Sequence, residues 1–301
     1  MQINRVFEYY DHKNLEKTLM ELKNKYEFLE IGSLGKSIFG KSIPRITLGN
    51  GKKNVIYIGA HHGMEWITSA LLMQFVHDLC EEYQNGRSVF DVSTHVLFET
   101  RKIHIVPMLN PDGIDYAIHG VNEDNVIYNR LIRMNGSTDF SHWQANARGI
   151  DLNHNYNSGF EEYKIIERKE NIICGATKYS GEYPESEPET RALCNFVRFE
   201  RPSLALTLHT QGEEIYYTSG EKTSDISLSL AKTLSRLTGY KISFPSGTAK
   251  YGGFTDWFIE EFDKPSFTLE CGHGENPLPF SDFEKIYSHI KRALFITPIL
   301  V

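Results

Sequence analysis

Residues 59 to 66, GAHHGMEW, combine two histidines and a glutamate, which are residue types that bind first-row metal ions. His62 and Glu65 are three positions apart, so they share one face of a first helical turn. A third ligand has to come from elsewhere, and His209, after the apolar run LALTL, is the natural candidate. A His₂Glu set leaves one position open for water, as in catalytic zinc sites. On its own, the short HxxE pattern is more typical of an ordinary helix N-terminus, and His209 and Glu270 at matching strand ends are what favour a metal site. His61 is a second possible ligand.

Polar side chains follow four short apolar runs that have the composition of buried strands. The runs are VIYIG (55 to 59), KIHIVPML (102 to 109), LALTL (204 to 208) and PSFTLE (265 to 270). The metal-binding residue types follow the first run, NPDG follows the second, His209 follows the third, and the fourth ends on Glu270. Because ligands bind beyond the carboxyl ends of strands in α/β sheets, we expect these groups to meet at one edge of a sheet.

Helical patterns lie between these runs, and their alternation with strands predicts an α/β fold. We expect one domain, residues 1 to 301, with a mixed, mostly parallel β-sheet flanked by helices. Two extended stretches, 28 to 36 and 43 to 49, precede the first run, and we expect long loops between 110 and 185. The predicted helices are 13 to 26, 65 to 82, about 186 to 200, about 224 to 238, 254 to 262 and about 281 to 297.

The composition excludes several classes of protein. The chain has 301 residues, of which 40% are hydrophobic, so it can bury a large core. A net charge of −7 without a long basic stretch argues against a nucleic-acid partner. The four cysteines form no CxxC pair, and no apolar run approaches the ~20 residues of a membrane span. The first residues lack the pattern of a signal peptide. These features predict a soluble protein of the reducing cytoplasm that does not bind membranes.

Seven short motifs give the chain a resemblance to a known family. They occur in the family's order between residues 59 and 272, and together they resemble the zinc carboxypeptidases of the carboxypeptidase A superfamily. The resemblance implies one zinc ion held by His62, Glu65 and His209, and so it favours His62 over His61. It also implies that Glu270 is the general base. The motifs are GAHHGMEW, VPMLNPDG, ARGIDLNHNYN, SEPET, LHTQGEE, GGFTDW and FTLECG.

The chemistry of such a site requires further groups. Glu270 would take a proton from the attacking water and later protonate the leaving amine. A cationic or hydrogen-bonding group has to steady the oxyanion of the transition state. Arg148 in NARG is the candidate, because the family supplies an arginine near this stretch. A surface arginine is the alternative interpretation, and another register of the alignment places Gln144 at that position.

The residues expected to bind the substrate depart from those of the digestive enzymes in the family. Where those enzymes have Asn-Arg to hold a terminal carboxylate, this chain has Asn153 and His154. A histidine is a weaker and pH-dependent anion receptor, so we expect these two residues to bind an anionic group on the leaving side of the substrate. The family's mobile tyrosine has no match either, since the register gives Ala249 or Thr248.

The motif variants LHTQGEE, DLNHNY and SEPET are most similar to those of bacterial γ-D-glutamyl-diaminopimelate peptidases. The predicted function is therefore hydrolysis of the γ-D-glutamyl–diaminopimelate bond of muropeptides, in the recycling of imported cell-wall fragments. A general metallocarboxypeptidase or a deacylase of the same superfamily is the alternative within enzymes. A non-catalytic peptide- or metal-binding module is the alternative outside them, and Glu270 argues against it because a binding module has no use for a general base.

Overall fold

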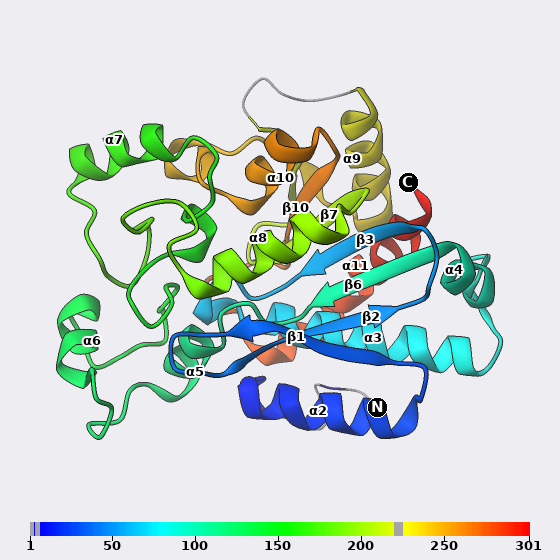
Figure 1. Ribbon diagram of the computed structural model, residues 1–301, viewed down its shortest axis with the longest axis horizontal. Helices are drawn as coiled ribbons and strands as arrows, with labels where there is room; N and C mark the ends of the chain where they lie inside the picture. Colours follow the sequence, from blue (N-terminus) through cyan, green and yellow to red (C-terminus); the bar gives the residue numbers. More distant parts are fainter. Residues whose placement is uncertain (1–2, 4–6, 220–224) are drawn as a thin grey trace.

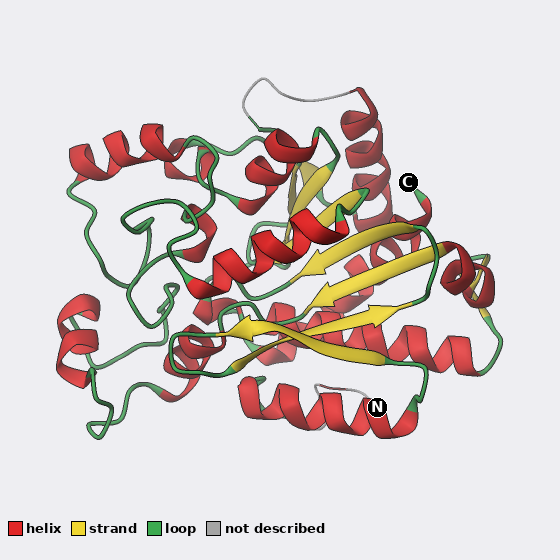
Figure 2. Ribbon diagram, in the orientation of Figure 1, coloured by secondary structure: helices red, strands yellow, loops and turns green. Residues whose placement is uncertain are grey.

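A central β-sheet with helices on both faces forms the framework (Figures 1 and 2). The computed structural model describes residue 3, residues 7–219 and residues 225–301, so the start of the helix predicted at 224 lies outside the described residues. Within these ranges the sheet has eight strands in the order β1-β2-β6-β3-β7-β10-β8-β9. Their bounds are β1 Glu30–Lys36, β2 Ser42–Leu48, β3 Lys53–Ile58, β6 Arg101–Val106, β7 Leu204–His209, β8 Glu214–Tyr216, β9 Lys241–Ile242 and β10 Ser266–Glu270.

The four predicted apolar runs form the centre of the sheet as β3, β6, β7 and β10. These strands pair in parallel, with β3 between β6 and β7, and β10 beyond β7. The flanking β1, β2 and β8 are antiparallel to their inner neighbours. All six residues of β7 are buried, as expected for a strand covered on both faces. The prediction of a mixed, mostly parallel α/β fold is confirmed.

Two hydrophobic cores lie on the two faces of the sheet. The larger one joins the sheet to α2 (His12–Lys25), α3 (Ile67–Gln84), α9 (Asp225–Thr238) and α11 (Phe283–Ile296). The smaller one lies under α8 (Pro188–Glu200) and α10 (Phe254–Phe262), which contribute Leu193 and Trp257 among other side chains. Further helices are α4 (Thr94–Thr100), α5 (Pro111–His119), α6 (Tyr128–Asn135) and α7 (Phe160–Glu170), and β4 (Ser88–Val89) pairs with β5 (Val92–Ser93). No helix of the described residues is long and apolar enough to cross a membrane.

The expectation of long loops between 110 and 185 is wrong for α5, α6 and α7. NPDG begins α5: the Asn110 side chain accepts a hydrogen bond from the Gly113 amide at 3.0 Å, and Pro111 stands in the first turn. Asparagine followed by proline marks a helix start as well as a turn. The helix expected at 65 is also displaced, because Gly63–Glu65 forms a 3₁₀ turn and α3 begins at Ile67.

A buried carboxylate ties the hairpin between β1 and β2 to α8. Glu189 is fully buried, and it accepts hydrogen bonds from the Ile38 amide at 3.2 Å and the Asn146 side chain at 3.3 Å. Burial, assisted by the negative charges of Glu187 and Asp112, raises the pKa of Glu189 to about 7. Glu189 therefore retains its proton in the folded protein at pH values where an exposed glutamate has lost it.

Candidate active site

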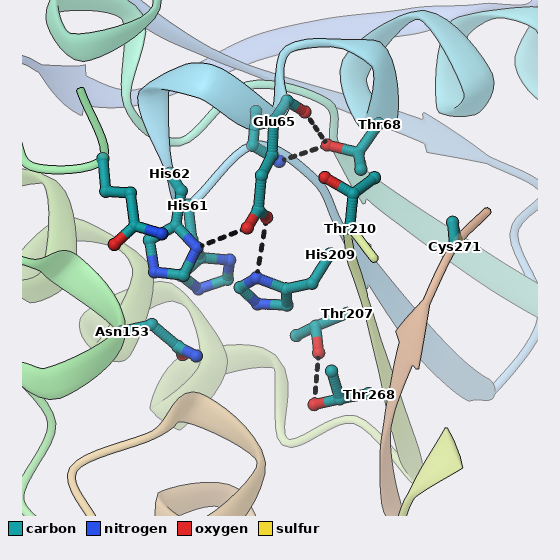
Figure 3. Close-up of polar contacts among 12 residues, drawn as sticks. His61, His62, Glu65, Thr68, Asn153, Thr207, His209, Thr210, Thr268 and Cys271 are labelled. Carbon is teal, nitrogen blue, oxygen red and sulfur yellow. Dashed lines mark hydrogen bonds and ion pairs between the residues drawn. The ribbon is translucent and has the colours of Figure 1, made fainter. Parts of the chain in front are cut away.

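Two histidines converge on one buried glutamate where β3 and β7 end (Figure 3). His62 Nδ1 lies 2.8 Å from Glu65 Oε1, and His209 Nδ1 lies 3.0 Å from Glu65 Oε2. One potential ligand atom from each of the three residues lies within 4.8 Å of the other two. A divalent cation could take the place of the protons held between these atoms. Two imidazole nitrogens and a carboxylate are also the donor set of a catalytic zinc site, so the residues fit this metal.

Close backbone packing holds the segment after β3 in place. The Ala60 amide donates a hydrogen bond to Thr68 Oγ1 at 2.9 Å, and that hydroxyl donates to the Glu65 carbonyl at 2.8 Å. Gly63 packs so tightly that a Cβ atom there would lie 2.4 Å from the Gly113 carbonyl oxygen. Only glycine fits this position. The turn therefore presents His62 and Glu65 to the strand end that carries His209.

Asp151 contacts the ring of His62, and sequence reasoning assigned it no role. Its Oδ1 lies 3.0 Å from His62 Nε2, and its two oxygens also accept hydrogen bonds from the Asn153 and Lys178 amides at 3.1 and 3.0 Å. Burial alone would raise the pKa of the Asp151 carboxyl, but the adjacent His62 and these hydrogen bonds hold it well below its usual range. A carboxylate on the far nitrogen of a ligating histidine fixes the ring and its tautomer.

His61 packs against this cluster without belonging to it. It is completely buried, its Nε2 lies 3.0 Å from the Tyr156 hydroxyl, and its ring stacks on His209 with the centroids 5.1 Å apart. It is absent from the groups of described side chains that could hold a metal ion. Burial lowers its pKa well below the usual range, so the ring is neutral. The structure gives His61 the position of a packing residue beside the ligands.

Glu270 and the two expected substrate-binding residues line one pocket with the histidines. The pocket has a volume of about 200 Å³ and includes His62, Asn153, His154, His209 and Glu270 in its lining; we call it the zinc-side pocket. Parallel pairing of β10 with β7 sets Glu270 directly beside His209. Burial, assisted by the negative charge of Glu65, raises the pKa of Glu270 well above its usual range. A carboxylate with a raised pKa is suited to accept and return a proton near neutral pH.

The structure corrects the expected charge of His154. Its ring stacks on Tyr163 with the centroids 4.2 Å apart, and its Nδ1 lies 2.9 Å from the Tyr251 carbonyl oxygen. Burial lowers the pKa of His154 below its usual value, so the ring is neutral at pH 7. A neutral ring that donates from Nδ1 to a carbonyl has only an acceptor at Nε2. In this state His154 offers a substrate carboxylate neither a charge nor a donor.

Asn153 keeps its expected place in the zinc-side pocket. Its Oδ1 accepts a hydrogen bond from the Phe254 amide at 3.1 Å, which fixes the side chain against the start of α10. Figure 3 shows this side chain across the site from Glu65. The amide nitrogen of Asn153 is the atom that can donate to a substrate, and it can do so without carrying a charge.

The structure does not bring Arg148 to the zinc-side pocket. Its side chain is half-exposed, its Nη1 lies 3.7 Å from Glu187 Oε2, and it lines a separate cavity of about 300 Å³. The reason is the tight turn from 146 to 149, in which the Arg148 amide donates to Asn146 Oδ1 and Gly149 has a φ of 75°. The expectation that Arg148 contacts the reacting atoms is therefore wrong.

Gln144, from the alternative register, does line the zinc-side pocket. Its carbonyl accepts a hydrogen bond from the Gly63 amide at 2.9 Å, which anchors it next to His62. Its side-chain oxygen accepts a hydrogen bond from the Thr177 hydroxyl. Because the oxygen is engaged in this way, the amide nitrogen is the atom that can donate into the pocket.

Comparisons with known proteins agree with this fold and this site. The family model for zinc carboxypeptidases, peptidase family M14, matches residues 15–292. The chain belongs to this family of zinc metallopeptidases, and the resemblance found in the sequence is confirmed.

Three individual proteins illustrate the relationship. The chain is 34% identical over 281 residues to γ-D-glutamyl-L-diamino acid endopeptidase 1 of Lysinibacillus sphaericus, an alignment that covers 92% of this chain and 69% of the relative. It is 31% identical over 293 residues to the uncharacterized protein YqgT of Bacillus subtilis, covering 95% and 77% of the two chains. The crystal structure of carboxypeptidase A from Helicoverpa armigera has the same fold, with a TM-score of 0.73 at 18% identity over 97% of this chain and 73% of that one.

Proposed function

We propose that residues 1 to 301 form the catalytic domain of a zinc-dependent peptidase that hydrolyses the γ-D-glutamyl–diaminopimelate bond of muropeptides. The observation that carries the activity is the ligand group of His62, Glu65 and His209 at a pocket that His62, His209 and Glu270 line together. The choice of substrate is supported by the relative from Lysinibacillus sphaericus, which is named for cleavage next to a diamino acid. Four free cysteines fit a reducing compartment, so the cytoplasm remains the predicted setting.

One zinc ion per chain is the proposed stoichiometry. His62, Glu65 and His209 would hold it, and Asp151 would fix the orientation of His62. The other group of described side chains that could hold an ion is Asp11, Asp115 and His119. There, His119 lies 2.8 Å from Asp11, and Lys41 lies 2.7 Å from Asp115. Because these charges are already compensated within the protein, we assign no zinc to that group.

Each side chain of the site has a separate role in the proposed hydrolysis. When bound, zinc would activate a water molecule for attack and polarise the peptide carbonyl. Glu270 accepts the proton of the attacking water and delivers it to the leaving amine as the peptide bond breaks. The side-chain NH₂ group of Gln144 donates a hydrogen bond to the carbonyl oxygen of the scissile peptide bond as negative charge develops on that oxygen. Asn153 donates a hydrogen bond to the leaving portion of the substrate.

A panel of four substrates tests the proposed function. We expect the zinc-loaded protein to cleave L-Ala-γ-D-Glu-meso-diaminopimelate with a kcat/KM at least about a hundredfold above that for N-acylated dipeptides that end in arginine or phenylalanine. The reverse order of kcat/KM would assign the chain to the general carboxypeptidases. Turnover of an N-acyl amino acid alone would indicate a deacylase. Tight peptide binding without turnover of any substrate would indicate a binding module.

A further inference from the structure

A second cavity adjoins the zinc-side pocket. It has a volume of about 670 Å³ and shares Thr218 and Pro245 with the pocket as lining residues. We call it the outer cavity; its lining also includes Ser219, Lys250, Tyr251 and Glu260. The two shared residues show that the two spaces lie next to each other at Thr218 and Pro245. A substrate group too long for the zinc-side pocket therefore has room in the outer cavity.

Helix α10 carries one carboxylate to each of these spaces. Asp256 lines the zinc-side pocket and Glu260 lines the outer cavity. The two residues are four positions apart, which places them on the same face of the helix. Ser219 donates a hydrogen bond to Glu260 Oε1 at 2.6 Å. The junction between the two spaces is therefore acidic.

Among the described residues, no cationic side chain forms an ion pair with Asp256. Asp256 is only 6% exposed, and neither it nor Glu260 forms an ion pair with any side chain in the described part of the chain. Burial, followed by the negative charge of Glu260, raises the pKa of Asp256 to about 8. Buried carboxylates in proteins are normally paired, so a cationic ligand group at this junction would supply the missing partner.

Lys250 adds the opposite charge to the outer cavity. It ends the 3₁₀ turn Gly247–Lys250, it is exposed, and it forms no ion pair within the described residues. His154, by contrast, is neutral and accepts at Nε2, so it cannot balance a substrate carboxylate in the zinc-side pocket. The junction and the outer cavity thus offer the carboxyl groups of Asp256, Glu260 and Glu162 and one ammonium group to a ligand.

We propose that the outer cavity binds the far end of a diamino-acid side chain on the leaving side of the scissile bond. The far ammonium group lies between Asp256 and Glu260, and the far carboxylate meets Lys250. In diaminopimelate four carbon–carbon bonds, roughly 5 Å when extended, separate the two α-carbons, which is a suitable span from one space into the next. This inference rests on the proposed function. It also assigns a binding residue, Lys250, to the far carboxylate, which is the group that distinguishes diaminopimelate from lysine.

Three substrates of the form L-Ala-γ-D-Glu-X separate the two charges. The residue X is meso-diaminopimelate, with a far ammonium and carboxylate, L-lysine, with the ammonium alone, or L-norleucine, with neither. We expect Glu260→Gln to lower kcat/KM about fivefold for the first two substrates and less than twofold for norleucine. We expect Lys250→Gln to lower kcat/KM about fivefold for diaminopimelate alone. The matched control is Lys285→Gln, which removes an exposed lysine of α11 that lies outside both cavities.

The pattern across substrates decides the question. Equal losses for all three substrates would show that the variants disturb the fold, and unchanged values for diaminopimelate would show that its far end lies elsewhere; either result overturns the inference. If the wild-type protein cleaves the three substrates and the variants do not discriminate among them, the proposed function survives without the outer cavity. If the wild-type protein cleaves none of them, the proposed function itself fails, and this inference fails with it.

Discussion

Replacing Asp151 by asparagine tests how the zinc ligands are held. Asp151 accepts hydrogen bonds from His62 Nε2 and from the Asn153 and Lys178 amides. An asparagine oxygen that faces His62 turns the NH₂ group toward the Lys178 amide, so two donors oppose each other. The flipped orientation sets the NH₂ group against His62 Nε2, which favours the tautomer with a proton on Nδ1, the nitrogen needed for the metal. Both orientations lose an interaction that the aspartate makes.

The expected magnitude follows from these contacts. Loss of a hydrogen-bonding partner of a ligating histidine typically weakens metal affinity about 10- to 100-fold, or about 1.4 to 2.7 kcal/mol. The opposed buried donor lowers the free energy of unfolding of the metal-free protein by about 1 to 3 kcal/mol. Zinc dissociation constants measured by competition with a chelator, together with denaturant unfolding of the metal-free protein, separate the two effects.

A matched control removes a carboxylate far from the pocket. Asp78 of α3 accepts hydrogen bonds from Lys291 at 2.6 Å and from the Tyr287 hydroxyl at 3.0 Å. We expect Asp78→Asn to lower the free energy of unfolding and to leave zinc affinity unchanged. The reasoning is refuted if Asp151→Asn binds zinc within twofold of the wild-type protein, or if Asp78→Asn weakens zinc binding to the same extent.

Four further variants examine other residues. Glu270→Gln keeps the shape but cannot accept a proton, so we expect kcat to fall by about 10²–10⁴-fold or more with zinc content unchanged; kcat within tenfold of wild type would exclude Glu270 as the base. Gln144→Ala should lower kcat by about 10²–10³-fold, whereas Arg148→Ala should change kcat less than twofold. Steady-state kinetics that show the opposite order would indicate that Arg148, and not Gln144, stabilises the oxyanion. Glu189 has a pKa of about 7 when folded against an ordinary value of 4.5, so the folded state binds more protons in this range and stability falls as pH rises from about 4.5 to 7. Denaturant unfolding across this range should show a flatter profile for Glu189→Gln, with a difference of at most about 3 kcal/mol, and parallel profiles would contradict the assignment.

The sheet and the positions of the metal-binding residues were predictable because their signals are local. Apolar runs such as the one before His209 identify buried strands, and parallel strands bring their carboxyl ends to one edge. Side chains that follow those runs must then lie near one another, whatever the loops between them do. The same reasoning placed Glu270, which ends its strand beside His209.

The remaining features depend on contacts that the sequence does not encode locally. The turn from 146 to 149 directs Arg148 away from the zinc-side pocket. In the alternative register of the alignment with the family, Gln144 takes the place of the arginine, and the structure sets Gln144 next to His62. The neutrality of His154 depends on Tyr163 and on the Tyr251 carbonyl, which come from separate segments. No local sequence motif identifies Asp151, because its role depends on its contact with His62, which is distant in the sequence.

The most direct test of the central claim is product analysis by mass spectrometry after incubation with L-Ala-γ-D-Glu-meso-diaminopimelate. The zinc-loaded protein is predicted to release L-Ala-D-Glu and free diaminopimelate. Chelator-treated protein is predicted to leave the peptide intact, and one equivalent of added zinc is predicted to restore cleavage. Cleavage that persists in the metal-free protein, or an intact γ-glutamyl bond after long incubation with the zinc-loaded protein, would contradict the account.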